Sequence, residues 1–182
     1  MSYSPRTILV GAAVCFALTA LARAADTGPR GIGHVATPAQ IAGWDIDVRA
    51  DGQGLPAGHG SVREGEAIYA QACAGCHGAK GEGKPADRLV GGFGTLATAK
   101  PVRTVGSYWP YATTLFDFVR RAMPFDAPQS LTADQVYAVS AYILYLNDIV
   151  PQDTVLDARS LPKVAMPNRN GFTSPDPRPD VR

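Results

Sequence analysis

The sequence is poor in the residues that build disulfide frameworks and metal clusters. It has three cysteines and three histidines among 182 residues. It also lacks an excess of charge of one sign, because its formal net charge at pH 7 is +1. A charge this close to zero excludes the basic footprint that a nucleic-acid-binding protein needs. No internal repeat is present, and the length suits one ordinary domain.

Long apolar runs are also scarce, and the one that exists lies at the N-terminus. Arg6 precedes an almost uncharged stretch from Ile8 to Ala22, and Ala22-Arg23-Ala24 is an A-x-A cleavage site. This pattern predicts a secretory signal peptide over residues 1–24 and export to the periplasm. An uncleaved membrane anchor is the alternative, but the run is short for a span. We therefore expect no membrane span after cleavage.

Cleavage changes the inventory of the mature chain. It removes Arg6 and Arg23, which lowers the formal net charge from +1 to about −1. It also removes Cys15, so that Cys73 and Cys76 are the two cysteines that remain. Both belong to one short motif, Cys73-Ala74-Gly75-Cys76-His77.

Helix signals recur along the mature chain, whereas no segment has a convincing strand pattern. Capping residues and apolar spacing of 3.6 residues mark each predicted helix. The fold class we expect is therefore all-α. Four helices are predicted. The first begins at Pro38 after the cap Thr37, and the second runs from Ser61 (with Glu64) to about Cys73. The third runs from Thr113 to Ala122, and the fourth starts at Thr132 (with Gln135) and ends by Pro151.

Glycine and proline divide the rest of the chain. Residues 25–60 form a glycine-rich N-terminal extension, and residues 61–150 hold the strongest helices. Residues 151–182 contain six prolines and no helical periodicity. We expect this last segment to be an extended arm on the surface.

The CxxCH motif fits three kinds of site. In the first, both thiols bond to the vinyl groups of a haem and the adjacent His77 becomes an axial iron ligand. In the second, the two cysteines form a thioredoxin-like redox disulfide. In the third, they form half of a zinc site. The sequence favours one covalently bound haem c, because zinc lacks a second cysteine pair and the motif follows a capped helix rather than a strand.

The second axial ligand of such a haem can be sought among the methionines. Met123 stands between two predicted helices in Ala122-Met123-Pro124, where the proline would stiffen the loop. A neutral sulfur ligand stabilises ferrous iron, which suits an electron carrier. Met166, in the proline-rich arm, is the second candidate, and His34 and His59 read as solvated loop histidines.

Other residues are candidates for supporting the haem. The ring nitrogen of His77 that faces away from iron needs an acceptor, and a backbone carbonyl of the loop containing Pro85 is the expected one. Tyr108, Trp109 and Tyr111 could line the haem crevice or bond a propionate. Arg103 could pair with a propionate. Ordinary packing under a loop is the alternative for each of these side chains.

These motifs resemble a class I cytochrome c over about residues 61–147: a helix with Gly65 and Tyr69 leads into CxxCH, and a methionine loop precedes a terminal helix with Ala141-Tyr142-Ile143. In that family the first and last helices cross at a small residue, which implies Gly65 against Tyr142 or Tyr145. Further segments are similar to one group within that class, the SoxD-type cytochrome subunits of sulfite or sulfur dehydrogenase. These segments are Trp44-Asp45-Ile46-Asp47-Val48, the run from Val105 to Ala112, Arg121-Ala-Met-Pro-Phe125 and Met166-Pro-Asn168.

The resemblance implies an electron-transfer subunit rather than an enzyme. In that family the cytochrome pairs with a molybdopterin sulfite dehydrogenase subunit, takes its electrons singly and passes them to a downstream cytochrome c. Well-known members carry two haems, whereas this chain has one CxxCH, which implies a monohaem member. The alternatives are a free-standing carrier to a terminal oxidase and a haem enzyme acting directly on thiosulfate or peroxide.

Overall fold

The computed structural model describes residues 34–173, so the predicted signal peptide lies outside the described residues. Two units are distinguished, one that ends at Asp45 and one that begins at Ile46. The described part of the first unit contains helix α2, Pro38–Trp44. Its N-terminus has the predicted cap, because the Thr37 hydroxyl accepts from the Gln40 N–H and the Gln40 side chain accepts from the Thr37 N–H.

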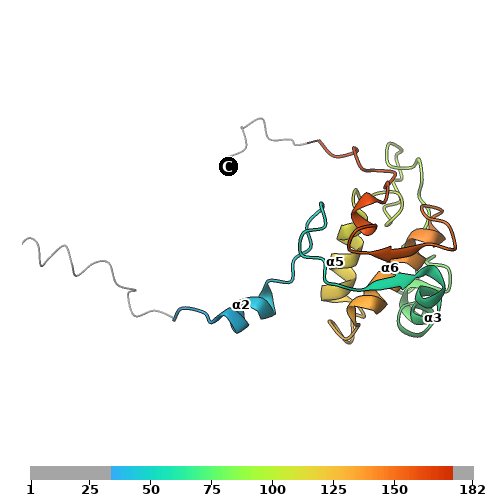
Figure 1. Cartoon of the computed structure of the whole chain (residues 1–182). Coiled ribbons are helices and arrows are strands. Elements are labelled where there is room, and N and C mark those ends of the chain that lie inside the picture. The colour runs from blue at the N-terminus through green and yellow to red at the C-terminus, as the bar shows by residue number, and fades with distance from the viewer. Residues whose placement is uncertain (1–33, 174–182) are drawn as a thin grey trace, which may run out of the picture. The chain divides into compact units, whose positions relative to one another are not determined.

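The second unit holds four helices and two short strands within its described residues (Figure 1). The caps predicted at Ser61 and Thr132 are confirmed as reciprocal capping boxes with Glu64 and Gln135. In chain order the elements are β1 (His59–Ser61), α3 (Val62–Ala72), α4 (Ala74–His77), α5 (Ala112–Ala122), α6 (Ala133–Leu146), β2 (Val155–Asp157) and a 3₁₀ turn, η1 (Leu161–Lys163).

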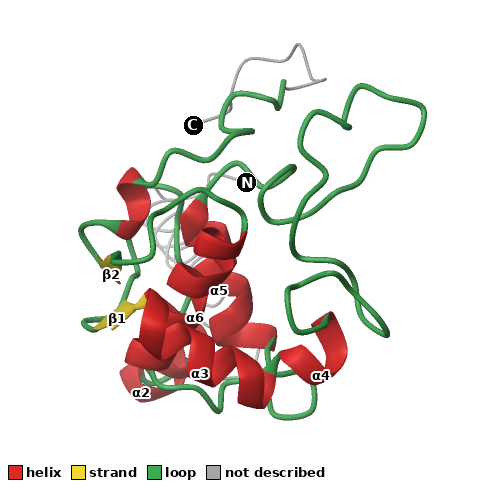
Figure 2. Ribbon diagram, turned by 90° about the vertical axis from the view of Figure 1, so that its right-hand side faces the viewer, coloured by secondary structure: helices red, strands yellow, loops and turns green. Residues whose placement is uncertain are grey.

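Helix α6 forms the centre of the core. Nine of its side chains, from Val136 to Leu144, are buried, so it is apolar on nearly every side. Helices α3 and α5 both pack on it (Figure 2). This arrangement is the crossing of first and last helices that the class I cytochrome fold implies. The contact at Gly65 is with Ala138 and Tyr142, which confirms Tyr142 as a neighbour and adds Ala138.

The expected all-α class is confirmed, although the described residues also contain a small two-stranded sheet that was not expected. Strands β1 and β2 pair antiparallel, with Gly60 opposite Leu156. A strand of three residues is too short to show an alternating pattern, which explains why the sequence gives no sign of it. Gly60 is required here, because a Cβ on it would collide with the backbone of Ala138 in α6.

The segment after Pro151 also differs from a surface arm. It contains β2 and η1, and three of its side chains, Leu156, Leu161 and Met166, are buried in the hydrophobic core. Burying three large apolar side chains stabilises the fold by several kcal/mol, at about 2 kcal/mol each. The described part of the arm is therefore a structural part of the unit, whereas the domain boundaries at residues 60 and 150 stay predictions.

Residues 46–56 attach to α5 and α6 through polar contacts. The Val48 N–H donates to the Asp117 carboxylate, and the Arg120 guanidinium donates to the Ile46 carbonyl. The Tyr137 hydroxyl of α6 donates to the Pro56 carbonyl at 2.9 Å. This end of the predicted extension is thereby anchored on the helix that leads to Met123.

Candidate haem site

The CxxCH segment folds as a single turn that follows α3. Cys73 ends α3, with its N–H donating to the Tyr69 carbonyl, and then the Cys76 and His77 N–H groups both donate to the Cys73 carbonyl. One turn thus carries both thiols and the imidazole. Gly78 closes it with φ of +84°, a conformation that suits glycine, and the Glu82 side chain occupies the place of a Cβ.

The two thiols are free and differ in exposure. Cys73 is half-buried against the core, whereas Cys76 is exposed. Burial, with a contribution from the neighbouring Cys76, raises the pKa of the Cys73 thiol to about 11. Redox-active CxxC pairs work with a lowered thiol pKa. The direction of this shift therefore argues against the thioredoxin-like alternative.

His77 has its ring orientation set by a backbone carbonyl. Its Nδ1 lies 2.7 Å from the Asp87 carbonyl oxygen. Since a carbonyl oxygen can only accept, Nδ1 is the donor in this bond, and in a neutral imidazole the lone pair then lies on Nε2. That tautomer is the one a metal-ligating histidine needs. The acceptor comes from the loop containing Pro85, where we expected it.

The loop from Gly78 to Gly91 is held on the CxxCH turn by backbone hydrogen bonds. Gly83 N–H donates to the His77 carbonyl at 2.7 Å, and Ala86 N–H donates to the Cys76 carbonyl at 2.9 Å. The Tyr69 hydroxyl of α3 donates to the Gly78 carbonyl at 2.9 Å. The distance between His77 and Asp87 is thus set by a network rather than by one contact.

The two methionines have different surroundings. Met123 caps the C-terminal end of α5, where its N–H donates to the Val119 carbonyl, and its side chain is half-buried against the core. Met166 is 3% exposed and is part of the core itself. A methionine buried in this way commonly fills a gap in a hydrophobic core, which accounts for Met166. Of the two candidates, Met123 is the more exposed, and its role as an axial ligand stays a prediction.

The aromatic run before α5 joins the arm to the rest of the unit. Asn168 Nδ2 donates to the Tyr108 carbonyl at 2.7 Å, and the Arg169 guanidinium lies 4.8 Å from the centre of the Tyr111 ring. Arg103 stacks over Tyr108, and Trp109 packs edge-to-face with Phe118 of α5. Arg103, Tyr108 and Tyr111 thus have packing partners, and a propionate role for them stays a prediction. The contacts of Asn168 and Arg169 with this run were not predicted, because contacts between segments so far apart in the sequence have no local signal.

The donor set fits a haem c. Two thiols lie on one turn, an imidazole presents a free Nε2, and a thioether stands at the end of another helix that packs on the same core. His34 and His59 are both exposed, as expected for solvated histidines. Among residues 34–173, no group of three or more His, Cys, Asp or Glu side chains comes together in a way that could hold a metal ion.

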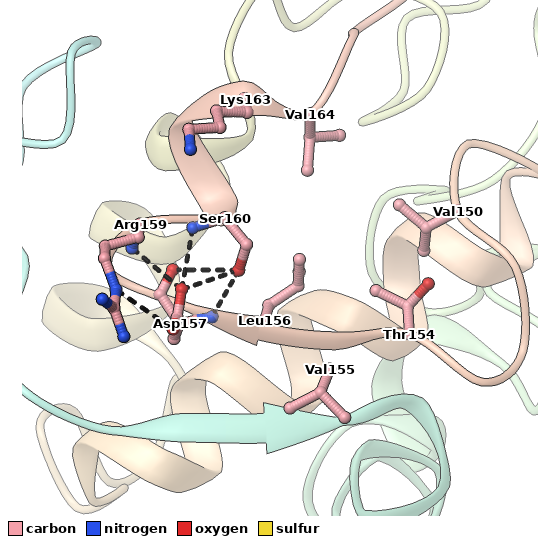
Figure 3. Close-up of a pocket in the computed structure, with 9 residues that line it drawn as sticks. All are labelled: Val150, Thr154, Val155, Leu156, Asp157, Arg159, Ser160, Lys163 and Val164. Carbon is pink, nitrogen blue, oxygen red and sulfur yellow. Dashed lines mark hydrogen bonds and ion pairs between the residues drawn. The ribbon is translucent and has the colours of Figure 1, made fainter.

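A shallow groove of about 510 Å³ lies over the arm and is separate from this donor set (Figure 3). It contains neither a CxxCH residue nor Met123. Its one carboxylate, Asp157, accepts from the N–H groups of Arg159 and Ser160 and from the Ser160 hydroxyl, and these bonds lower its pKa. The Asp157 carboxylate and the Ser160 hydroxyl thus have hydrogen-bond partners within the groove. Its lining is Val150, Thr154, Val155, Leu156, Asp157, Arg159, Ser160, Lys163 and Val164.

No helix within residues 34–173 has both the length and the apolar character needed to cross a membrane.

Comparisons with known proteins identify the family. Residues 60–143 match the family described as cytochrome c oxidase, cbb3-type, subunit III. No curated protein matches the sequence. Among solved structures, the sulfane dehydrogenase SoxCD from Paracoccus pantotrophus contains a chain with 45% sequence identity and a TM-score of 0.76. The alignment covers 82% of this chain and 74% of that chain. The chain therefore belongs to the class I cytochrome c family, as a SoxD-type cytochrome.

Proposed function

We propose that this chain is a periplasmic monohaem cytochrome c and the electron-transfer subunit of a molybdenum sulfite or sulfur dehydrogenase. Family membership implies haem c. One CxxCH motif gives the number of haems as one, and the two free thiols on its turn are the groups to be bonded to it. Such a haem carries one electron at a time between the ferric and ferrous states.

The axial positions are assigned to His77 and Met123. The single observation that carries the proposal is the hydrogen bond from His77 Nδ1 to the Asp87 carbonyl, because it aims the ring and makes Nε2 the nitrogen that is available to bind iron. Met123 presents a half-buried thioether from the end of α5. Two neutral ligands that fill both axial positions leave no site for a substrate, so the chain itself is not the enzyme.

The identity of the partner is supported by the breadth of the similarity to SoxCD. The matched 82% of this chain is far more than the CxxCH motif and its helix. On this proposal a molybdopterin subunit oxidises the sulfur compound, and this chain passes the electrons to a downstream cytochrome c. The A-x-A site at Ala22-Arg23-Ala24 supports export to the periplasm, where the covalent haem of a c-type cytochrome is attached.

Haem binding can be tested on the full-length protein purified from a host that attaches haem c. We expect one haem per chain that resists acid extraction, and a reduced spectrum typical of a six-coordinate c-type cytochrome. His77→Ala should lose that spectrum, whereas His59→Ala should keep it, because His59 is exposed on β1. A colourless wild-type protein would contradict the proposal and would favour the thioredoxin-like redox disulfide instead.

The partner can be tested by purification from the native periplasm and by reduction kinetics. Co-purification with a molybdenum protein, and reduction of the haem by sulfite only when that protein is present, would support the assignment. Isolation as a monomer that an oxidase reoxidises, without a molybdenum partner, would show a free-standing carrier instead. Rapid cyanide binding to the ferric protein would favour a haem enzyme acting directly on thiosulfate or peroxide, since it requires an exchangeable axial position.

A further inference from the structure

Asn147 is a buried polar residue at the end of α6 that contacts the loop following the CxxCH motif. It is 2% exposed. Its Nδ2 donates to the Leu89 carbonyl at 3.2 Å and to the Ile143 carbonyl at 2.9 Å, and its Oδ1 accepts from the Gly91 N–H at 3.2 Å. The side-chain amide therefore uses both of its donors and one acceptor to join the loop to the last turn of α6.

The contact at Leu89 lies two residues from the carbonyl that orients His77. The Asp87 carbonyl accepts from His77 Nδ1, and Leu89 and Val90 donate their N–H groups to the Gly81 carbonyl. The loop segment that follows Asp87 is thus held to Gly81 by backbone hydrogen bonds and to Asn147 by the side-chain amide. A shift at Leu89 would move the Asp87 carbonyl relative to the imidazole.

Two further groups hold the same segment in place. The buried Thr104 hydroxyl donates to the Gly91 carbonyl at 2.7 Å, next to the N–H that Asn147 accepts. Gly106 lies directly against Asn147, because a Cβ on Gly106 would collide with Oδ1. The amide therefore lies in a close-packed setting, where it has little freedom to follow a loop that moves.

We propose that Asn147 is a positioning residue for His77, and that through the Leu89–Gly91 segment it helps to set the reduction potential of the haem. The inference rests on the proposed function, since it requires His77 as an axial ligand. A strong hydrogen bond from Nδ1 makes Nε2 a better electron donor, which favours ferric iron. Loosening the Asp87 carbonyl weakens that bond, so the potential rises.

The test is the midpoint potential of the full-length holoprotein carrying Asn147→Leu. We expect the ferric–ferrous equilibrium to shift toward the ferrous form by about threefold or more. The His77 Nδ1–H resonance of the ferrous protein should move in the direction of a weaker hydrogen bond. A folded Asn147→Leu variant with an unchanged potential and an unchanged resonance would overturn the inference.

Two substitutions separate positioning from general loss of stability. Thr104→Val removes the bond to Gly91 from the other side of the loop and should shift the potential in the same direction. Thr113→Val is the matched control: Thr113 is 1% exposed and bonds the Ala50 carbonyl, away from the His77 loop. It should lower stability without a shift in potential.

The variants also cover the case in which Asn147→Leu does not fold. Thr104→Val then tests the inference by itself, and an unchanged midpoint potential in that variant would contradict it. A wild-type protein without histidine–methionine coordination is a different result, because it would refute the proposed function before any Asn147 variant is measured.

Discussion

Gly65 of α3 lies directly on the backbone of Ala138 in α6. A Cβ at position 65 would collide with the Ala138 carbonyl and would also meet the Tyr142 Cβ. The absence of a side chain therefore sets how closely the two helices approach. Because α3 leads straight into Cys73 and α6 leads to Asn147, this contact fixes the CxxCH turn relative to the loop that orients His77.

Gly65→Ala should destabilise the protein by about 3 kcal/mol, because the added methyl group meets backbone rather than a movable side chain. The intrinsic helix preference for alanine works in the opposite direction by about 1 kcal/mol. Gly43→Ala in α2 is the matched control, since nothing lies within 4 Å of the added Cβ. Urea unfolding of the holoprotein measures both. Equal stability of Gly65→Ala and wild type would show that the helices can separate without cost.

Met123→Ala should remove the sulfur-to-iron charge-transfer band of the ferric haem and lower the midpoint potential, because a neutral sulfur ligand stabilises ferrous iron. Met166→Leu should keep the band and lower the free energy of unfolding by less than about 1.5 kcal/mol, since it is a nearly volume-conserving change in the core. Absorption spectroscopy and redox titration distinguish them. The reverse pattern would make Met166 the ligand.

Asp117→Ala should lower the free energy of unfolding by about 2 kcal/mol, because its carboxylate accepts from the Val48 N–H and from Arg121. Asp47 binds the same arginine at 2.9 Å, but its side chain is 70% exposed. Asp47→Ala should therefore cost less than about 1 kcal/mol. Chemical denaturation of both variants checks the order. A larger loss for Asp47→Ala would show that the surface ion pair, rather than the bond to Val48, anchors residues 46–56.

Alkaline pH should destabilise the protein through two buried tyrosines. Burial, aided by nearby negative groups, raises the pKa of Tyr69 and that of Tyr137 to about 12 from a usual 10.0. The unfolded chain then loses these protons at lower pH than the folded chain. Stability from this source is complete below pH 10 and falls between pH 10 and about 12.

Tyr137→Phe tests that dependence. It removes the hydrogen bond to the Pro56 carbonyl and should cost about 1 kcal/mol near neutral pH. Its stability should then fall less steeply above pH 10 than that of wild type. Tyr111→Phe serves as the control, because its hydroxyl makes no hydrogen bond to the described residues 34–173. Urea unfolding at several alkaline pH values gives the slopes, and parallel slopes for Tyr137→Phe and wild type would contradict the prediction.

The features that could be predicted from the sequence are those encoded locally. The capping boxes at Thr37, Ser61 and Thr132 combine two residues three apart, so the starts of three helices follow directly from the sequence. The CxxCH turn and the loop that supplies the acceptor for His77 are local too. Predicting α5 from Thr113 missed its start at Ala112 by one residue.

What could not be predicted depends on contacts between distant segments. Leu161 and Met166 stand among prolines without periodicity, so nothing in their neighbourhood shows that they enter the core. Asn147 directly follows the apolar helix α6, a position where asparagine is common at helix ends, so its identity alone does not indicate a further role. Its bonds to Leu89 and Gly91 span more than fifty residues of sequence. Such contacts become visible only when α6 and the loop are placed together.

The antiparallel pairing of β1 with β2 joins the segment before α3 to the segment after α6. Strand β1 precedes α3 and the CxxCH turn, strand β2 follows α6, and Gly60 and Leu156 lie opposite each other in the pair. A fragment limited to residues 61–150, the domain expected from the sequence, would lose this strand pairing. It would also expose the part of the core that Leu156 and Leu161 cover. We therefore expect the smallest fragment that folds to extend beyond residues 61–150 at both ends.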